Sequence, residues 1–255
     1  MSAAARSDRD VAERALAWTR WQRDSLADHK EAWEHGSILR TPRYPTWFEA
    51  SLVRVQDDPH MTVAGLIAFA DQALAGFAHR LVSFEVAQAA APLREGFTAA
   101  GWRTHSLVWM HHEGPRPAPP HASVREVPYD AVRHLREGWH QEDFPGQDAS
   151  DFHAHLREVQ VARGDRVLAI HEHGEPVGYA TLGRGQGQTE VEAVYVLPNH
   201  RGQGRGTALT QAAIAAAPDS EDLWICADAD DRPQHLYARL GFRPVLYTMD
   251  FLRLP

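Results

Sequence analysis

Residues 194–207 read Val-Tyr-Val-Leu-Pro-Asn-His-Arg-Gly-Gln-Gly-Arg-Gly-Thr, and this stretch decides the fold. Its β-branched and aromatic beginning is typical of a strand. Pro198 ends that strand because proline has no amide hydrogen to donate to a neighbouring strand. Glycines at alternate positions follow, and the alanine-rich residues 207–217 predict a helix. A strand, a glycine-rich turn and the beginning of a helix together predict a binding site for a phosphate group.

The spacing of these glycines distinguishes the turn from two common phosphate-binding loops. Gly202, Gly204 and Gly206 lie two residues apart. They therefore form neither the Gly-x-x-x-x-Gly-Lys-Ser/Thr loop of NTPases nor the Gly-x-Gly-x-x-Gly loop of dinucleotide-binding folds. Arg201 and Arg205 add positive charge that can pair with phosphate oxygens.

Two motifs resemble the GNAT superfamily of acyl-CoA N-acyltransferases. Residues 201–206, Arg-Gly-Gln-Gly-Arg-Gly, match its Arg/Gln-x-x-Gly-x-Gly/Ala loop, and residues 194–198 resemble the fourth strand of that family. Residues 236–242, Leu-Tyr-Ala-Arg-Leu-Gly-Phe, resemble its second signature, a helix that ends in Tyr-x-x-x-Gly-Phe. The resemblance covers roughly residues 121–255 and implies an α/β (α+β) GNAT fold, a mixed twisted sheet flanked by helices.

The resemblance also implies acetyl-CoA, or another acyl-CoA, as co-substrate. The residues expected to hold it are the backbone amides of Val194, Tyr195 and Val196, and the pyrophosphate loop formed by Arg201, Gly202, Gln203, Gly204, Arg205, Gly206 and Thr207. Asp230 stands where the family commonly has an asparagine that contacts the pantetheine arm. A carboxylate cannot donate as an amide does, although Asp is a favourable N-cap, so Asp230 is expected to cap the helix that follows.

Three residues are expected to carry the chemistry. Glu190 and Glu192 are two residues apart, so on a strand their side chains point to the same face and either can take the proton of the amine. Tyr237 matches the family tyrosine that protonates the departing thiolate; the structural alternative is a buried aromatic residue with a satisfied hydroxyl.

The acceptor is expected to contact Trp139, His140, Glu142 and Phe144, in the segment where family members have a variable loop. This aromatic and acidic mixture suits an amine with an apolar body. The implied reaction is direct transfer of an acetyl group from acetyl-CoA to the primary amine of a small molecule. Two alternatives remain open: a non-catalytic acyl-CoA-binding or regulatory module, and acyl transfer with a carrier-bound or tRNA-bound substrate.

Composition narrows the class of protein. The formal net charge of −8 argues against a nucleic acid partner, which would require a basic face. The single cysteine, Cys226, fits a reducing cytoplasm, and neither a secretory signal nor an apolar run of about 20 residues is visible. The 16 histidines lack the spacing of common zinc sites, so no metal is expected. We expect a cytoplasmic monomer or homodimer.

The sequence predicts two domains. Residues 115–120 contain four prolines and form a stiff linker between an N-terminal domain, residues 1–114, and a catalytic GNAT domain, residues 121–255. Residues 8–35 have helical periodicity and are predicted to form one or two helices. Residues 97–102 align with residues 237–242 at an offset of 140, which suggests a tandem pair whose first copy has lost the glycine loop. An unrelated cap domain is the alternative.

Overall fold

A computed structural model of the chain describes residues 3–115, 123–218 and 222–255. Residues 116–120 of the predicted linker therefore lie outside the described residues. The chain divides into a first unit, Met1–Trp109, Ala227–Asp231 and Pro244–Pro255, and a second unit, Met110–Cys226 and Arg232–Arg243. Neither unit is continuous in sequence, because two segments from beyond residue 226 belong to the first. That the N-terminal part is a degenerate copy stays a prediction.

The first unit is built around a mixed sheet. Its elements in chain order are α1 (Ala3–Asp24), β1 (His29–Trp33), β2 (Gly36–Arg40), a 3-10 turn (Phe48–Ala50), β3 (Leu52–Val55), α2 (Val63–Ala73), β4 (Arg80–Phe84), α3 (Ala87–Ala90), a second 3-10 turn (Ala91–Leu93), α4 (Arg94–Ala99), most of β5 (Arg103–His112) and most of β11 (Phe242–Arg253). The strand order is β1-β2-β3-β4-β11-β5. Strands β1, β2 and β3 pair antiparallel, β3 and β4 pair parallel, and β4 and β11 pair antiparallel.

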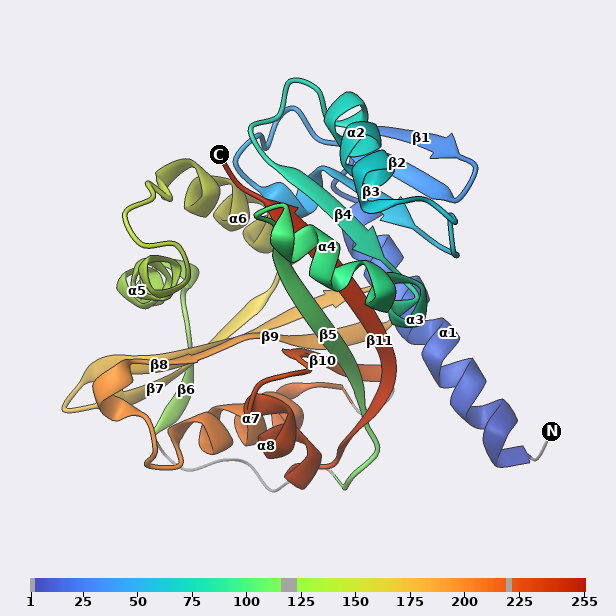
Figure 1. Cartoon of the computed structure of the whole chain (residues 1–255). Coiled ribbons are helices and arrows are strands. Elements are labelled where there is room, and N and C mark those ends of the chain that lie inside the picture. The colour runs from blue at the N-terminus through green and yellow to red at the C-terminus, as the bar shows by residue number, and fades with distance from the viewer. Residues whose placement is uncertain (1–2, 116–122, 219–221) are drawn as a thin grey trace. The chain divides into compact units, whose positions relative to one another are not determined.

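The core of the first unit lies between this sheet and helices α2 and α4, which run beside β4 (Figure 1). Val53 and Val55 alternate along β3 and so face the same side of the sheet as Leu66 of α2. Phe97 of α4 stacks on Phe251 of β11, with ring centroids 4.0 Å apart. Each such fully buried side chain contributes about 1.5–3 kcal/mol to folding.

The predicted helical segment at residues 8–35 is helical only in its first part. Helix α1 ends at Asp24, and residues His29–Trp33 form strand β1, so the helix prediction is wrong there. Strand β1 pairs with β2 at the margin of the sheet, and four of its five residues are exposed. Charged side chains such as Lys30 and Glu31 are usual on an edge strand, where they discourage pairing with another chain. In the sequence, these charged residues continue the helical periodicity of residues 8–35 and so resemble the polar face of a helix.

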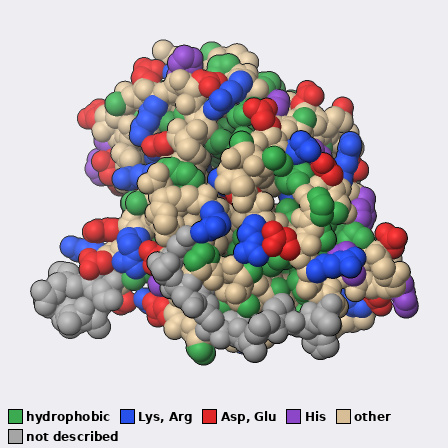
Figure 2. Space-filling model, turned by 180° about the vertical axis from the view of Figure 1, so that it is seen from behind, with side chains coloured by type: hydrophobic (Ala, Val, Ile, Leu, Met, Phe, Trp, Pro, Cys, Tyr) green, Lys and Arg blue, Asp and Glu red, His purple; other side chains and the backbone are tan. Residues whose placement is uncertain are grey.

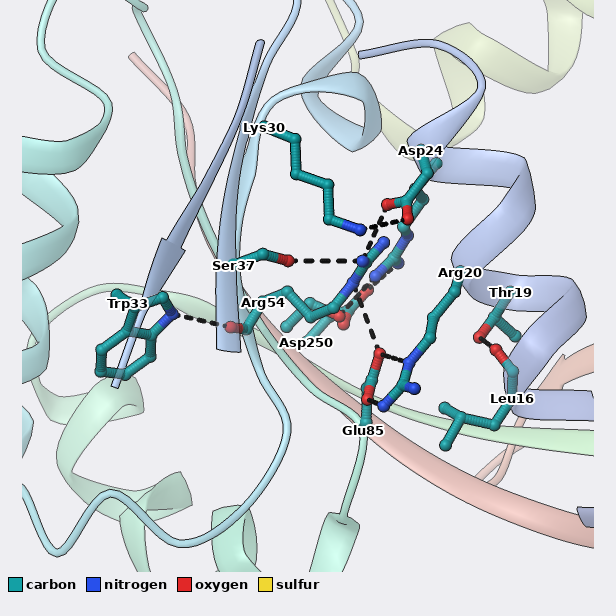
Figure 3. Close-up of polar contacts among 12 residues, drawn as sticks. Leu16, Thr19, Arg20, Asp24, Lys30, Trp33, Ser37, Arg54, Glu85 and Asp250 are labelled. Carbon is teal, nitrogen blue, oxygen red and sulfur yellow. Dashed lines mark hydrogen bonds and ion pairs between the residues drawn. The ribbon is translucent and has the colours of Figure 1, made fainter. Parts of the chain in front are cut away.

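Ionised side chains bridge α1 and the sheet in a group that we call the Arg54 cluster: Arg20, Arg23, Asp24, Arg54, Glu85 and Asp250 (Figure 3). The Arg54 side chain is only 2% exposed. Its Nη1 lies 2.8 Å from Asp24 Oδ1 and its Nε 3.4 Å from Glu85 Oε1. Arg20 pairs with the same Glu85, and Arg23 lies 3.2 Å from Asp250. Charges buried to this degree are tolerated only when they are paired.

The second unit also contains a mixed sheet. Its elements are β6 (Val124–Val127), a 3-10 turn (Tyr129–Val132), α5 (Arg133–Asp143), α6 (Ser150–Arg163), β7 (Arg166–Glu172), β8 (Glu175–Gly185), β9 (Gln188–Val196), a 3-10 turn (Pro198–His200), α7 (Arg205–Ala216), most of β10 (Asp222–Asp228) and α8 (Pro233–Arg239). The strand order is β10-β9-β8-β7-β6. Strands β6 to β9 pair antiparallel, and β9 and β10 pair parallel.

Helices cover both faces of this second sheet. Helix α7 packs on one side of β7, β8 and β9, and α5 and α6 lie on the other (Figure 1). Leu135 of α5 packs with Val167, Tyr179 and Tyr195 in one buried cluster. The mixed strands flanked by helices that the sequence predicts are therefore confirmed.

The surface carries both signs of charge. On the face shown in Figure 2, basic and acidic side chains are interspersed. Among the described residues, no helix combines the length and the apolar character that crossing a membrane requires.

Candidate active site

Strand β9 separates from its parallel neighbour and bulges before the glycine loop. Pairing with β10 covers Gln188–Val191, and β9 continues beyond it to Val196. On the β8 side the register shifts between Tyr179 and Thr181, and Ala193 adopts φ of +51°. A bulge with a residue in the left-handed region redirects backbone groups out of the ladder. The predicted amide donors, Val194, Tyr195 and Val196, follow directly after it.

The glycine loop leads into a helix that has no capping side chain. Gly202 and Gly204 adopt φ of +75° and +77°, a conformation that residues other than glycine rarely adopt. Gly204 is the N-cap of α7, and the structure shows no side-chain hydrogen bond from it. The first turn-closing bond joins the amide of Ala208 to the carbonyl of Gly204, at 3.0 Å. The amides of Arg205, Gly206 and Thr207 precede it, so the positive end of α7 faces outward at the loop.

Both arginines of the loop are bound to carboxylates of other elements. Arg201 Nη2 lies 2.7 Å from Glu142 Oε2, and its Nε donates to the carbonyl of Val196 at 2.8 Å. Arg205 Nη2 lies 2.6 Å from Glu172 Oε2 of β7. His200 Nδ1 is 2.8 Å from that same oxygen. The predicted phosphate-binding arginines are thus held in place by ion pairs within the unit.

Glu142 joins the predicted acceptor segment to the predicted cofactor segment. The hydroxyl of Tyr195 donates to Glu142 Oε1 at 2.6 Å, while Arg201 binds Oε2. Trp139, one turn earlier on α5, stacks on the Tyr195 ring at 5.7 Å with an interplanar angle of 12°. Burial and the hydrogen bond to Glu142 raise the pKa of Tyr195 to about 12. Burial opposes the charge of Glu142, but hydrogen bonds from Tyr195 and Arg201 lower its pKa below the ordinary value.

The two candidate bases differ in their surroundings. Glu190 is buried, with 6% of its surface exposed, and both carboxylates contribute to the electrostatics of Arg163 at the end of α6. Glu192 Oε1 accepts from Arg163 Nη2 at 2.7 Å, and its Oε2 accepts from Gln160 Nε2 at 3.0 Å. Asp165 Oδ2 accepts from the same Arg163 nitrogen at 2.5 Å. Burial raises the pKa of Glu192 even though Arg163 stabilises the charged form.

Tyr237, the candidate acid, lies on the short helix α8. It is buried, with 6% of its surface exposed, and its ring meets Phe242 edge to face at 6.2 Å. Gly241, between them, adopts φ of +94° and ends the helix. The Tyr-x-x-x-Gly-Phe motif therefore fixes Tyr237 against the beginning of β11.

His140 and Phe144 form a separate aromatic group with residues of α6. The His140 ring lies 5.1 Å from that of Phe144, 5.5 Å from that of Phe152 and 5.6 Å from that of His153. Burial lowers the pKa of both histidines. This part of the predicted acceptor segment thus packs among aromatic rings, where burial disfavours the charged form of both histidines.

Asp230 belongs to the first unit, unlike the other candidate site residues. Its carboxylate pairs with Arg94 at 2.7 Å, and its amide donates to Asp228 Oδ1 at 2.7 Å. The N-cap of α8 is Arg232, so the expectation that Asp230 caps this helix is wrong. A turn centred on the Asp228 side chain takes up the residues between β10 and the helix.

Two groups of polar residues in the site were not predicted. Gln160, Arg163 and Asp165 surround Glu192, and Glu172 with His200 holds Arg205. The one local signal is Gly164, whose φ of +75° ends α6 and turns Asp165 toward Arg163. Among the residues that the structure describes, no group of three or more His, Cys, Asp or Glu side chains is arranged to hold a metal ion.

Comparison with known proteins agrees with the geometry. Residues 129–242 match the model of the Acetyltransferase (GNAT) family. The L-amino acid N-acyltransferase MnaT of Escherichia coli K12 is 30% identical over 129 residues, which cover 48% of this chain and 73% of the relative. An uncharacterised N-acetyltransferase of Mycobacterium tuberculosis H37Rv is 35% identical over 81 residues, or 30% of this chain. The chain spans about half of that relative's length, 52%.

A solved structure extends the similarity of fold to most of the chain. The GCN5-related N-acetyltransferase of Kribbella flavida aligns with a TM-score of 0.56 and 24% identity, over 94% of this chain and 94% of its own. Together, the bulged strand, the glycine loop, the Tyr-x-x-x-Gly-Phe helix and the relationship to MnaT lead to one conclusion: this chain has the GNAT fold and belongs to the GNAT acetyltransferase family.

Proposed function

We propose that this protein transfers an acetyl group from acetyl-CoA directly to the primary amine of a small molecule. One observation carries the proposal. The divergent, bulged end of β9 leads into a helix whose N-cap is a left-handed glycine and whose first turn is flanked by two arginines. Strand residues beyond the pairing with β10 suit the amide-rich pantetheine arm, and the end of α7 suits the pyrophosphate.

The roles of the candidate bases follow from their contacts. Both oxygens of Glu192 are bound, by Arg163 and Gln160, so we assign Glu192 to positioning the strand. We assign the proton transfer from the attacking amine to Glu190, the position at which the family resemblance places the base. As the nitrogen bonds to the carbonyl carbon and the carbon–sulfur bond breaks, Tyr237 gives its proton to the thiolate.

Separate substitutions test these roles. Glu190→Gln, which removes the proposed base, should lower kcat by about 10²–10⁴-fold. Tyr237→Phe, which removes the proposed acid, should also lower kcat. Glu192→Gln should chiefly lower the unfolding midpoint, since Arg163 loses one charged partner. Unchanged turnover in all three variants would reject the catalytic assignment.

The acceptor is a small amine that contacts the α5 segment. Trp139 and Glu142 sit against Tyr195, next to the bulge, and offer an aromatic surface with a carboxylate. The name of the Escherichia coli relative, an L-amino acid N-acyltransferase, supports an amine of amino-acid size. The net charge of −8, with both signs interspersed on the face shown in Figure 2, supports a small molecule over a nucleic acid.

We propose further that the first unit is a degenerate copy of the second. Gly101 and Gly241 each adopt a left-handed conformation, at φ +81° and +94°, between a short helix and a strand. Trp102 and Phe242 follow them and are both buried, at 3% exposed. In this view the first unit binds no acyl-CoA, and the one cofactor site belongs to the second.

The decisive experiment is calorimetric titration with acetyl-CoA of the parent protein, Gly204→Glu and Gly187→Glu. Both glycines have a left-handed φ, +77° and +68°, and open space where a Cβ would lie. The two substitutions therefore strain the backbone alike, but only Gly204 adjoins the proposed pyrophosphate site. We expect micromolar binding to the parent and to Gly187→Glu, and none to Gly204→Glu. Equal binding to all three would place the cofactor elsewhere; no binding to the parent would favour a module that uses another donor.

A further inference from the structure

Glu142 accepts two charge-assisted bonds from the segment that would hold the cofactor. Its Oε1 takes the Tyr195 hydroxyl at 2.6 Å and its Oε2 takes Arg201 Nη2 at 2.7 Å. The three residues come from the last turn of α5, the end of β9 and the loop that follows. One carboxylate therefore ties the acceptor-side helix to the glycine loop.

A carboxylate is chemically close to a phosphate in this contact. Both present anionic oxygens to the donors of a guanidinium group, at similar hydrogen-bond lengths. The Nη2 group that binds Glu142 is thus the group that an incoming pyrophosphate would seek, while Nε stays on the Val196 carbonyl at 2.8 Å. Glu142 occupies a position that a cofactor phosphate would otherwise use.

The ion pair between Glu142 and Arg201 is accessible enough for another anion to replace Glu142. The Arg201 side chain is 49% exposed and that of Glu142 is 35% exposed, so water and ions reach both. Ion pairs at this exposure are weak and screened. In contrast, Arg205 is only 15% exposed; like Arg201, it also donates to a backbone carbonyl, that of His200 at 3.0 Å. Arg201 is the more readily released of the two arginines.

We infer that Glu142 is an internal competitor of the cofactor: it neutralises Arg201 in the empty protein and is displaced when the pyrophosphate of acyl-CoA binds. The inference rests on the proposed function, since it requires acyl-CoA at this loop. It adds that the affinity for the donor is held below its attainable value by a residue of the acceptor-side helix. Glu142 belongs to α5, the helix that also carries Trp139 and is expected to contact the amine.

The test compares two donors in two matched variants. Glu142→Gln removes the charge of the competitor. Glu137→Gln, on the same helix, removes a charge that pairs with Arg133 of that helix, at 2.7 Å. The donors are acetyl-CoA and acetyl-pantetheine, which has the same thioester and arm but no nucleotide or phosphate.

We expect Glu142→Gln to bind acetyl-CoA about 3- to 10-fold more tightly, as befits the loss of one partly exposed competing ion pair. Its affinity for acetyl-pantetheine should not change, and Glu137→Gln should match the parent with both donors. In an Arg201→Gln background, the gain from Glu142→Gln should vanish, because the shared partner is gone.

Three results would overturn the inference. Equal acetyl-CoA affinity in the parent and Glu142→Gln would show that Glu142 does not compete. Weaker affinity in Glu142→Gln would show that Glu142 supports the loop instead. A lack of acetyl-CoA binding in every variant, the parent included, would reject the proposed function and this inference with it.

Discussion

The two units contain the same strand–helix–strand connection, but only one of them leaves its helix end available. In the first, β3 leads through a loop and α2 to the parallel strand β4; in the second, β9 leads through a loop and α7 to the parallel strand β10. The antiparallel neighbour carries a glycine at matching places, Gly36 opposite Val55 and Gly178 opposite Val196. This correspondence supports the proposal that the units are copies.

The beginnings of the two helices differ in what satisfies them. Thr62 caps α2, and its hydroxyl accepts from the amide of Gly65 at 3.1 Å. The loop before it carries Asp57 and Asp58, whose charge would repel a phosphate. At α7 the cap is Gly204, which has no side chain, and the nearby charges are arginines. The first helix end is capped by its own threonine, whereas the second has no side-chain cap.

The strands differ as well. The register of β2 with β3 runs without a shift from Gly36 opposite Val55 to Leu39 opposite Leu52, whereas β8 and β9 shift at the bulge. The Arg54 cluster packs α1 against the face of β3 that does not face α2 (Figure 3). The two connections therefore share their architecture but differ in the helix cap and in the strand register, and we expect these local differences to decide where an anion binds.

The largest expected effect is on the Arg54 cluster. Arg54→Ala would remove the buried cation that Asp24 and Glu85 share, leaving Asp24 with Lys30 and Glu85 with Arg20, and should lower the free energy of unfolding by about 3 kcal/mol. Urea titration followed by circular dichroism measures this loss. The control is Arg43→Ala, whose side chain is 51% exposed and pairs with Asp28. It should cost less than about 1 kcal/mol.

Acetyl-CoA affinity should be the same in Arg54→Ala, Arg43→Ala and the parent, measured below the unfolding transition. Loss of acetyl-CoA binding in Arg54→Ala alone would contradict the proposal that only the connection of the second unit binds the cofactor.

Substitutions of the two matching glycines, Gly36 and Gly178, should have effects of intermediate size. A Cβ on Gly36 would lie 2.2 Å from the Arg54 carbonyl oxygen, and one on Gly178 would lie 2.7 Å from the Tyr195 carbonyl oxygen. Since backbone must move in both cases, Gly36→Ala and Gly178→Ala should each cost about 1–3 kcal/mol. Only Gly178→Ala displaces the bulged strand, so calorimetry should show weaker acetyl-CoA binding for that variant alone. Weaker binding in Gly36→Ala as well would mean that the first connection also takes part.

The smallest expected effect concerns the cap of α2. Thr62→Ala removes the acceptor of the Gly65 amide and should lower the free energy of unfolding by about 1 kcal/mol. Thr98→Ala is the control, because that exposed hydroxyl bonds only to the Arg94 carbonyl of its own helix. Neither should change the affinity for acetyl-CoA. A gain of acetyl-CoA binding stoichiometry in Thr62→Ala would show that the cap is what closes the first connection.

Local patterns in the sequence were sufficient to predict the motif strand, the turn and the helix. Pro198 and the alternating glycines act through their own backbone conformation, so their effect does not depend on distant residues. The mixed sheet was implied by the resemblance of these motifs to the GNAT superfamily. Strand β1 could not be predicted in this way, because its pairing with β2 outweighs the helical periodicity of its charged residues.

The partners of the site residues could not be predicted, because they come from distant parts of the chain. Glu142 and Arg201 are 59 residues apart, and Glu192 and Gln160 are 32 apart. Both pairs depend on how α5 and α6 pack on the sheet. For the same reason, the sequence alone did not show that both oxygens of Glu192 are bound, by Arg163 and Gln160.

The division of the chain also sets an order of assembly during synthesis. Strand β11 pairs with β4 through Met249 opposite Phe84 and Phe251 opposite Val82, and its Phe251 forms part of the first unit's core. The ribosome makes this strand only after every residue of the second unit. Domains usually complete their folding in the order in which they emerge. Here the second unit can complete its folding first. Until residues 244–253 are made, strand β4 of the first unit lacks its partner β11 and has an unpaired edge.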